Sequence, residues 1–127
     1  MVEFALALPV FLLMLVALFD FGRGVYTYNG LSEAAREISR ITSVYPGLTL
    51  GASPQTAERV AVQKGLTPGM SDPAFACLNV DGTPSSDLPC TSGDYVQVTV
   101  TSVYSPVTLL GLGGSFTLTA TSSSEIP

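Results

Sequence analysis

Few residues of this chain could do covalent or metal chemistry. None of its 127 residues is a histidine, which excludes serine-triad hydrolysis, histidine zinc sites and histidine-ligated haem. Two cysteines, Cys77 and Cys90, flank a turn-rich segment at residues 81–84. Their even number and loop-like spacing predict a disulfide in an oxidising compartment, with two buried free thiols as the alternative. Closing a loop of this length would stabilise the fold by about 3 kcal/mol.

The acidic and glycine-rich loops predict no further site. Asp81, Asp87 and Asp94 offer oxygen atoms of the kind that calcium prefers, but their spacing matches no calcium loop, so we expect solvated carboxylates. Residues 111–114 contain three glycines but lack the lysine and serine of a phosphate loop, so a turn between strands is expected. No cofactor, no metal and no enzymatic activity are therefore expected, and a tethered envelope enzyme is the least favoured function.

The charge distribution argues against a nucleic-acid partner. The net charge is −5, and all five basic residues lie in the first half of the chain, ending at Lys64. A basic surface that neutralises phosphates cannot be built from the acidic second half. Hydrophobic residues make up 46% of the chain and charged residues only 12%, which is about half the charged fraction of an ordinary soluble domain.

The apolar residues are concentrated in an N-terminal run. The sixteen positions from Phe4 to Phe19 carry no charge and no hydrogen-bonding side chain. A helix that is hydrophobic all round needs burial all round. Exposing the thirteen large apolar side chains between Phe4 and Phe21 would cost on the order of 25 kcal/mol at ~2 kcal/mol each, more than a whole domain's stability. The run must therefore lie in lipid or among other chains.

The helical pattern continues well past this run. Leu31, Ala34, Ala35 and Ile38 recur at helical spacing, opposite a charged face that offers i,i+3 pairs. Those expected pairs are Glu33–Arg36 and Glu37–Arg40. A proline at position 9 predicts a kink or a local opening over residues 5–9. A helix from Val2 to Val44 would span ~65 Å. The remaining ~80 residues would form a globule only about 30 Å across, so the apolar half of the helix must protrude from it.

The remaining residues predict a small domain. Ser53 is a candidate N-cap for a short helix from Pro54 to Lys64, which Gly65 would end and which would turn residues 57, 60 and 61 to the core. Alternating valines at 96–100 and apolar residues at 116–120 predict antiparallel strands, and residues 74–80 a third. The predicted fold is α+β: an N-terminal hydrophobic helix over 1–45, with 1–23 as the assembly or membrane segment, and a sheet domain over 46–127 packed on the helix's C-terminal half.

Three motifs occur in order along the helix, EFALALP at 3–9, DFGR at 20–23 and AARE at 34–37. They resemble the pattern of the TadE/TadG-like family of the tight-adherence (Tad) pilus system, and the strand-rich stretch from residue 95 onward is similar to the C-terminal strands of that family. The resemblance implies a type IV pilin-like protein that is trimmed by a prepilin peptidase, held in the inner membrane, and extracted by the pilus assembly machinery into a cell-surface filament.

The resemblance also implies a role for Glu3. In pilin-like proteins a glutamate near the mature N-terminus pairs with the N-terminal amine of a neighbouring subunit. That glutamate is normally the fifth residue, so the third position here implies either processing at an unusual site or the loss of two residues.

Two pilus functions are then expected. The first is a structural pilin of an extracellular, adhesive fimbrium, a homo-oligomeric helical filament joined through the apolar helix. Its expected assembly residues are Glu3, Phe4, Leu8, Pro9, Leu12, Leu15 and Phe19. The alternative is a minor membrane-anchored pseudopilin that primes or caps assembly. Three tyrosines, Tyr26, Tyr28 and Tyr45, could stack between subunits or lie at a membrane interface, or else pack between helix and sheet.

Overall fold

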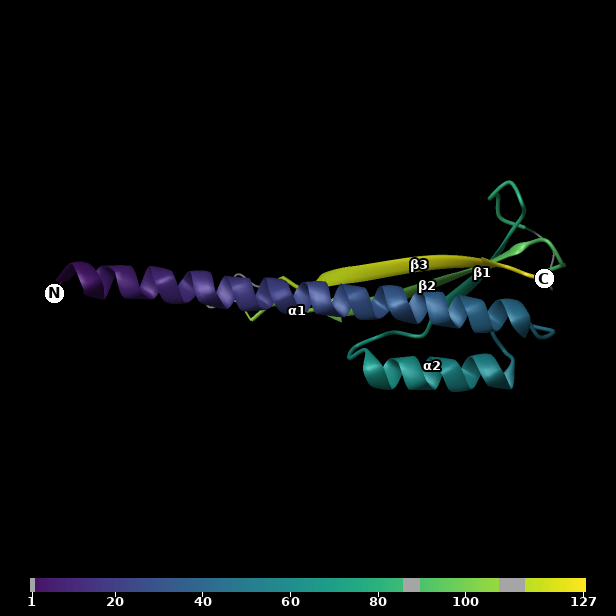
Figure 1. Ribbon diagram of the computed structural model, residues 1–127, viewed down its shortest axis with the longest axis horizontal. Coiled ribbons are helices and arrows are strands. Elements are labelled where there is room, and N and C mark those ends of the chain that lie inside the picture. Colours follow the sequence, from purple (N-terminus) through teal and green to yellow (C-terminus); the bar gives the residue numbers. More distant parts are fainter. Residues whose placement is uncertain (1, 86–89, 108–113) are drawn as a thin grey trace.

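One long helix carries a small sheet domain on its C-terminal half (Figure 1). The computed structural model describes residues 2–85, 90–107 and 114–127. Its elements, in chain order, are α1 (Val2–Val44), α2 (Pro54–Leu66), β1 (Ala74–Leu78), β2 (Tyr95–Tyr104) and β3 (Phe116–Glu125). This confirms the α+β class and the protruding N-terminal helix predicted from the sequence. The glycine-rich turn predicted at 111–114 lies outside the described residues, except for Gly114.

Helix α1 is unbroken over 43 residues, with Pro9 inside it. The opening expected at residues 5–9 is absent, and Figure 1 shows no sharp bend there. Proline has no N–H group, so the carbonyl of Ala5 lacks the helical partner that other carbonyls have. The helix accepts this loss without a break in its path.

Helix α2 begins as predicted but ends later. The side chain of Ser53 accepts a hydrogen bond from the backbone N–H of Thr56, and Pro54 occupies the first turn. Gly65 does not end the helix, which continues to Leu66. The C-cap Thr67 is extended, with φ −116° and ψ 97°, because the proline that follows it disfavours helical backbone.

The buried face of α2 also differs from the prediction at two of its three positions. Thr56 and Gln63 are buried, Val60 is partly buried, and Ala57 and Ala61 are exposed. The reason is the hydroxyl contact of 3.2 Å between Thr56 and Thr42 of α1, which turns the stripe at 56, 60 and 63 towards α1.

The sheet has three antiparallel strands in the order β1-β2-β3. Val98 of β2 lies opposite Phe75 of β1 and Ser122 of β3. Alternate residues of β2 are buried, as the sequence predicted. Strand β1 ends at Leu78 rather than at residue 80, because the backbone N–H of Asn79 turns to donate to the carbonyl of Thr83.

The core lies between α1 and the sheet. Its fully buried members are Leu31, Ala34, Ala35 and Ile38 of α1 and Val96, Val98 and Val100 of β2. Hydroxyl pairs continue this contact towards the C-terminal end of α1, where Ser39 donates to Ser122 and Ser43 meets Ser124, each at 3.2 Å. Helix α2 packs against α1 away from the sheet (Figure 1).

Two further contacts complete the domain. Cys77 and Cys90 form the predicted disulfide, with their Cα atoms 5.8 Å apart, and it joins β1 to the segment before β2. The charged pairs differ from the prediction: within residues 2–85 neither i,i+3 pair forms, and Glu37 instead pairs with Arg59 of α2 at 3.5 Å. Because α2 packs against α1, Glu37 pairs with a residue of the other helix and not with the residue of its own helix that local spacing predicted.

Candidate functional site

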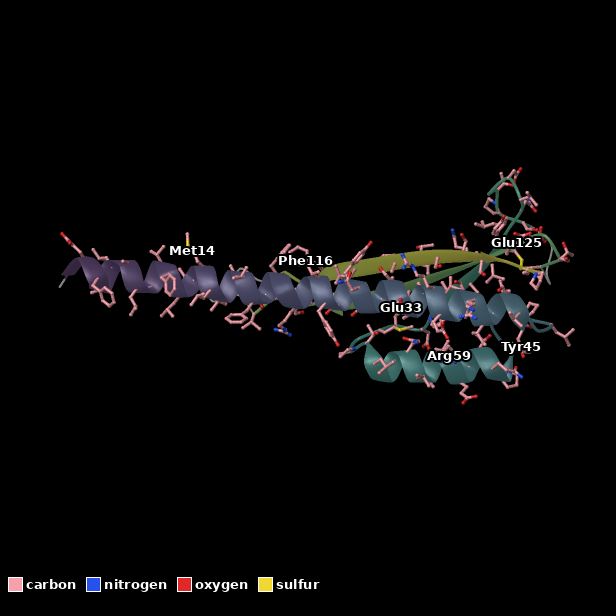
Figure 2. The ribbon with its side chains drawn as sticks, viewed as in Figure 1. Met14, Glu33, Tyr45, Arg59, Phe116 and Glu125 are labelled. Atoms are coloured by element: carbon pink, nitrogen blue, oxygen red, sulfur yellow. A yellow bond between two sulfur atoms is a disulfide. The ribbon has the colours of Figure 1, made fainter. Side chains whose placement is uncertain are left out.

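The N-terminal half of α1 carries an apolar surface that the described residues leave exposed. Phe4 is 73% exposed, Phe11 58% and Phe19 71%. The helix contains a stretch long and apolar enough to cross a membrane, and no part of that stretch is buried by the described residues. Figure 2 shows side chains such as Met14 standing clear of every other element.

Five of the seven predicted assembly residues share one side of this segment. Phe4, Leu8, Leu12, Leu15 and Phe19 follow one another at intervals of three or four residues, which places them along one stripe of the helix. Leu15 is partly covered and the other four are exposed. Pro9 is also exposed and lies beside the stripe.

The exposed apolar surface extends beyond that stripe. Leu6 and Met14 are each at least 69% exposed, and they lie on the other sides of the helix. The stripe alone therefore understates the surface that a partner or lipid must cover. The signal for these residues was present in the sequence, since the run has no polar side.

Glu3 lies in the first turn of α1 with an exposed side chain. A carboxylate there is favoured by the positive end of the helix dipole. Within the described part of the chain it has no ion-pair partner. Its position at the tip of the apolar segment leaves it available to a group from another molecule.

A polar cluster marks the place where the apolar segment meets the domain. The Tyr104 hydroxyl donates to the backbone carbonyl of Asp20 at 2.6 Å. Arg23 lies 3.8 Å from the Asp20 carboxylate, with its guanidinium carbon 6.0 Å from the centre of the Tyr104 ring. The end of β2 is thereby tied to α1. Sequence reasoning missed Tyr104, whose only signal was its position at the end of an alternating strand.

The two described loop aspartates form hydrogen bonds with residues of their own loops. Asp81 accepts hydrogen bonds from the hydroxyl and the backbone N–H of Thr83, and these bonds lower the pKa of its carboxyl group. Asp94 accepts equivalent bonds from Thr91. Asp87 lies outside the described residues. Among the residues that are described, no three acidic or cysteine side chains gather as a metal site would require.

Comparison with known proteins bears on the same segment. Residues 1–40 match the family model described as TadE-like protein. No curated protein and no solved structure matches the chain. The matched residues include the exposed apolar segment, the Asp20–Arg23 cluster and the first part of the buried face of α1. Over these N-terminal residues the chain is similar to the TadE-like family, and the same residues include the stretch that is long and apolar enough to cross a membrane.

Proposed function

We propose that the protein is a structural pilin, which polymerises into a Tad-like filament through the apolar half of α1. The observation that supports this most strongly is that the described residues bury no side chain of that half, although the domain has a core of its own. Before assembly the segment is held in the inner membrane, and in the filament it is surrounded by the same segment from neighbouring subunits. The domain forms the outer, cell-surface shell.

The energetics favour a bundle with many neighbours. A single partner helix covers one stripe, whereas Leu6 and Met14 face other directions than Phe4 and Leu12. A helix that is apolar on every side is satisfied only when it is surrounded. A helical filament core supplies that environment in water, and lipid supplies it before extraction.

Glu3 sets the axial register of neighbouring subunits in this proposal. A carboxylate enclosed among apolar helices requires a cationic partner. The N-terminal amine of a neighbouring subunit lies at the same end of the helix bundle and supplies that charge. Prepilin peptidase, which exposes such an amine, and the assembly machinery are the partners that this mechanism requires.

The register role is tested by Glu3→Ala in the full chain, with Glu33→Ala as the matched control. Glu33 lies on the same helix and is also exposed, but in the half that packs on the sheet. Removing one partner of an enclosed charge pair costs about 3–5 kcal/mol, so filament yield should fall about a hundredfold or more. Glu33→Ala should assemble normally.

Electron microscopy of sheared filaments measures the yield, and the unfolding midpoint in detergent shows whether the domain is intact. Normal filaments from Glu3→Ala would refute the register role. The minor-subunit alternative is decided by the number of copies of this chain per length of purified filament. A structural pilin repeats at every helical step, whereas a priming or capping subunit occurs a few times per filament.

A further inference from the structure

A second apolar surface lies where the protruding helix enters the domain. Phe21, Val25 and Tyr28 of α1 face Tyr104, Pro106 and Phe116 at the end of the sheet, and we call these six residues the junction collar. With Asp20 and Gly24 they line a groove of about 380 Å³. Phe21 is 72% exposed, Phe116 60% and Tyr28 49%.

The collar does not belong to the domain core. The fully buried face of α1 begins at Leu31, nearly two turns after Val25. A Cβ atom at Gly24 would lie 3.8 Å from the Tyr104 ring, so the end of β2 rests on the helix there. Figure 2 shows Phe116 at the end of the sheet that faces the protruding segment. The collar is thus ordered by the domain and left open on its outer side.

The position of the collar along α1 matches the edge of a bilayer. A hydrocarbon core of ~30 Å takes about twenty helical residues, and a count from Glu3 reaches about residue 23. The headgroup zone adds roughly 5–7 Å, or four to five residues. Phe21 therefore lies at the hydrocarbon boundary, and Val25 and Tyr28 lie within the headgroup zone. Phe116 lines the same groove as these residues.

The side chains suit that zone. Aromatic rings gather at membrane interfaces, and the exposed Arg23 lies where anionic headgroups would attract it. Asp20, the acidic residue at this level, is largely shielded from the headgroups, because its side chain is only 15% exposed and is paired with Arg23. The collar is continuous with the exposed apolar helix, so the lipid that surrounds the helix also reaches the collar.

We propose that the junction collar docks the domain onto the lipid interface, so that the end of the sheet rests on the membrane while α1 spans it. This inference rests on the membrane-anchored stage of the proposed function. The domain then has a fixed depth before assembly, and extraction must release the collar from the headgroup zone as well as α1 from the hydrocarbon.

The absence of tryptophan from the sequence permits a direct test in the full chain. Three variants each carry one fluorophore: Phe116→Trp in the collar, Phe11→Trp in the apolar helix, and Leu48→Trp at the far end of the domain, where Leu48 is 94% exposed. Each is reconstituted at several protein-to-lipid ratios in phosphatidylcholine–phosphatidylglycerol vesicles. The acyl chains are brominated either near the headgroup or at mid-chain.

The expected result is a graded quenching. Phe11→Trp loses most fluorescence to mid-chain bromine, Phe116→Trp to bromine near the headgroup, and Leu48→Trp to neither. If Phe11→Trp is quenched while Phe116→Trp emits as a tryptophan in water does, the collar proposal is overturned and the membrane anchor still holds. A blue-shifted but unquenched Phe116→Trp would overturn it in favour of a second copy of the chain. If no variant is quenched, the anchored stage and the collar both fail.

Discussion

The two halves of α1 are one continuous helix in two different situations. Between Phe4 and Phe19 the helix is apolar on all sides, and the domain buries none of it. Between Leu31 and Ser43 one stripe is buried against the sheet and α2, while the other side is charged. The domain therefore buries apolar side chains of the C-terminal half only. The apolar surface of the N-terminal half must be covered by lipid or by other chains.

The largest expected contrast comes from the same substitution in the two halves. Leu31 is fully buried and Leu12 is 49% exposed. Leu31→Ala should lower the free energy of unfolding by about 2–5 kcal/mol, because it leaves a cavity in the core. Leu12→Ala should change it by less than about 0.5 kcal/mol and should instead weaken assembly. Denaturant unfolding in detergent and filament yield measure the two effects.

The comparison fails if Leu12→Ala destabilises the domain as much as Leu31→Ala does. That result would mean that the N-terminal half packs on its own domain. Circular dichroism of each variant before unfolding checks that both start from the same helix content.

Reduction of the disulfide should affect the domain alone. Cys77 and Cys90 enclose a short loop, with a sequence separation of 13, and opening it should cost about 3 kcal/mol. The Cys77→Ser/Cys90→Ser double variant should unfold at correspondingly lower denaturant concentration. Hydrogen exchange in detergent should rise in the strands and stay unchanged at residues 4–19. Faster exchange in both regions would show that the two halves of α1 are coupled.

A smaller effect is expected from pH at the turn after β1. The pKa of Asp81 is lowered from 3.8 chiefly by the Thr83 hydroxyl. A carboxyl group with a lowered folded-state pKa stabilises the fold above its unfolded pKa, and this contribution is lost as pH falls through the folded value. Thr83→Val should raise the pKa of Asp81 and leave the apolar half of α1 unaffected. A carboxyl NMR titration measures this, and an unchanged titration would show that the hydroxyl is not the cause.

The sequence predicted those features that depend on local pattern. The helix from 2 to 44, the alternation of β2 and the disulfide were confirmed, because periodicity and cysteine spacing are properties of neighbouring residues. The Glu37–Arg59 pair, the Thr56–Thr42 contact on the buried face of α2 and the Tyr104 contact with Asp20 were missed. Each joins residues from different elements, and their distance in space depends on packing.

The most direct test of this account is sedimentation of the full chain after detergent is removed in the absence of lipid. Because the domain leaves the helix from Phe4 to Phe19 uncovered, the chain should associate, and electron micrographs should show fibres. A stable monomer in detergent-free buffer, with residues 4–19 protected from hydrogen exchange, would contradict the account, since the apolar half would then be buried within its own subunit.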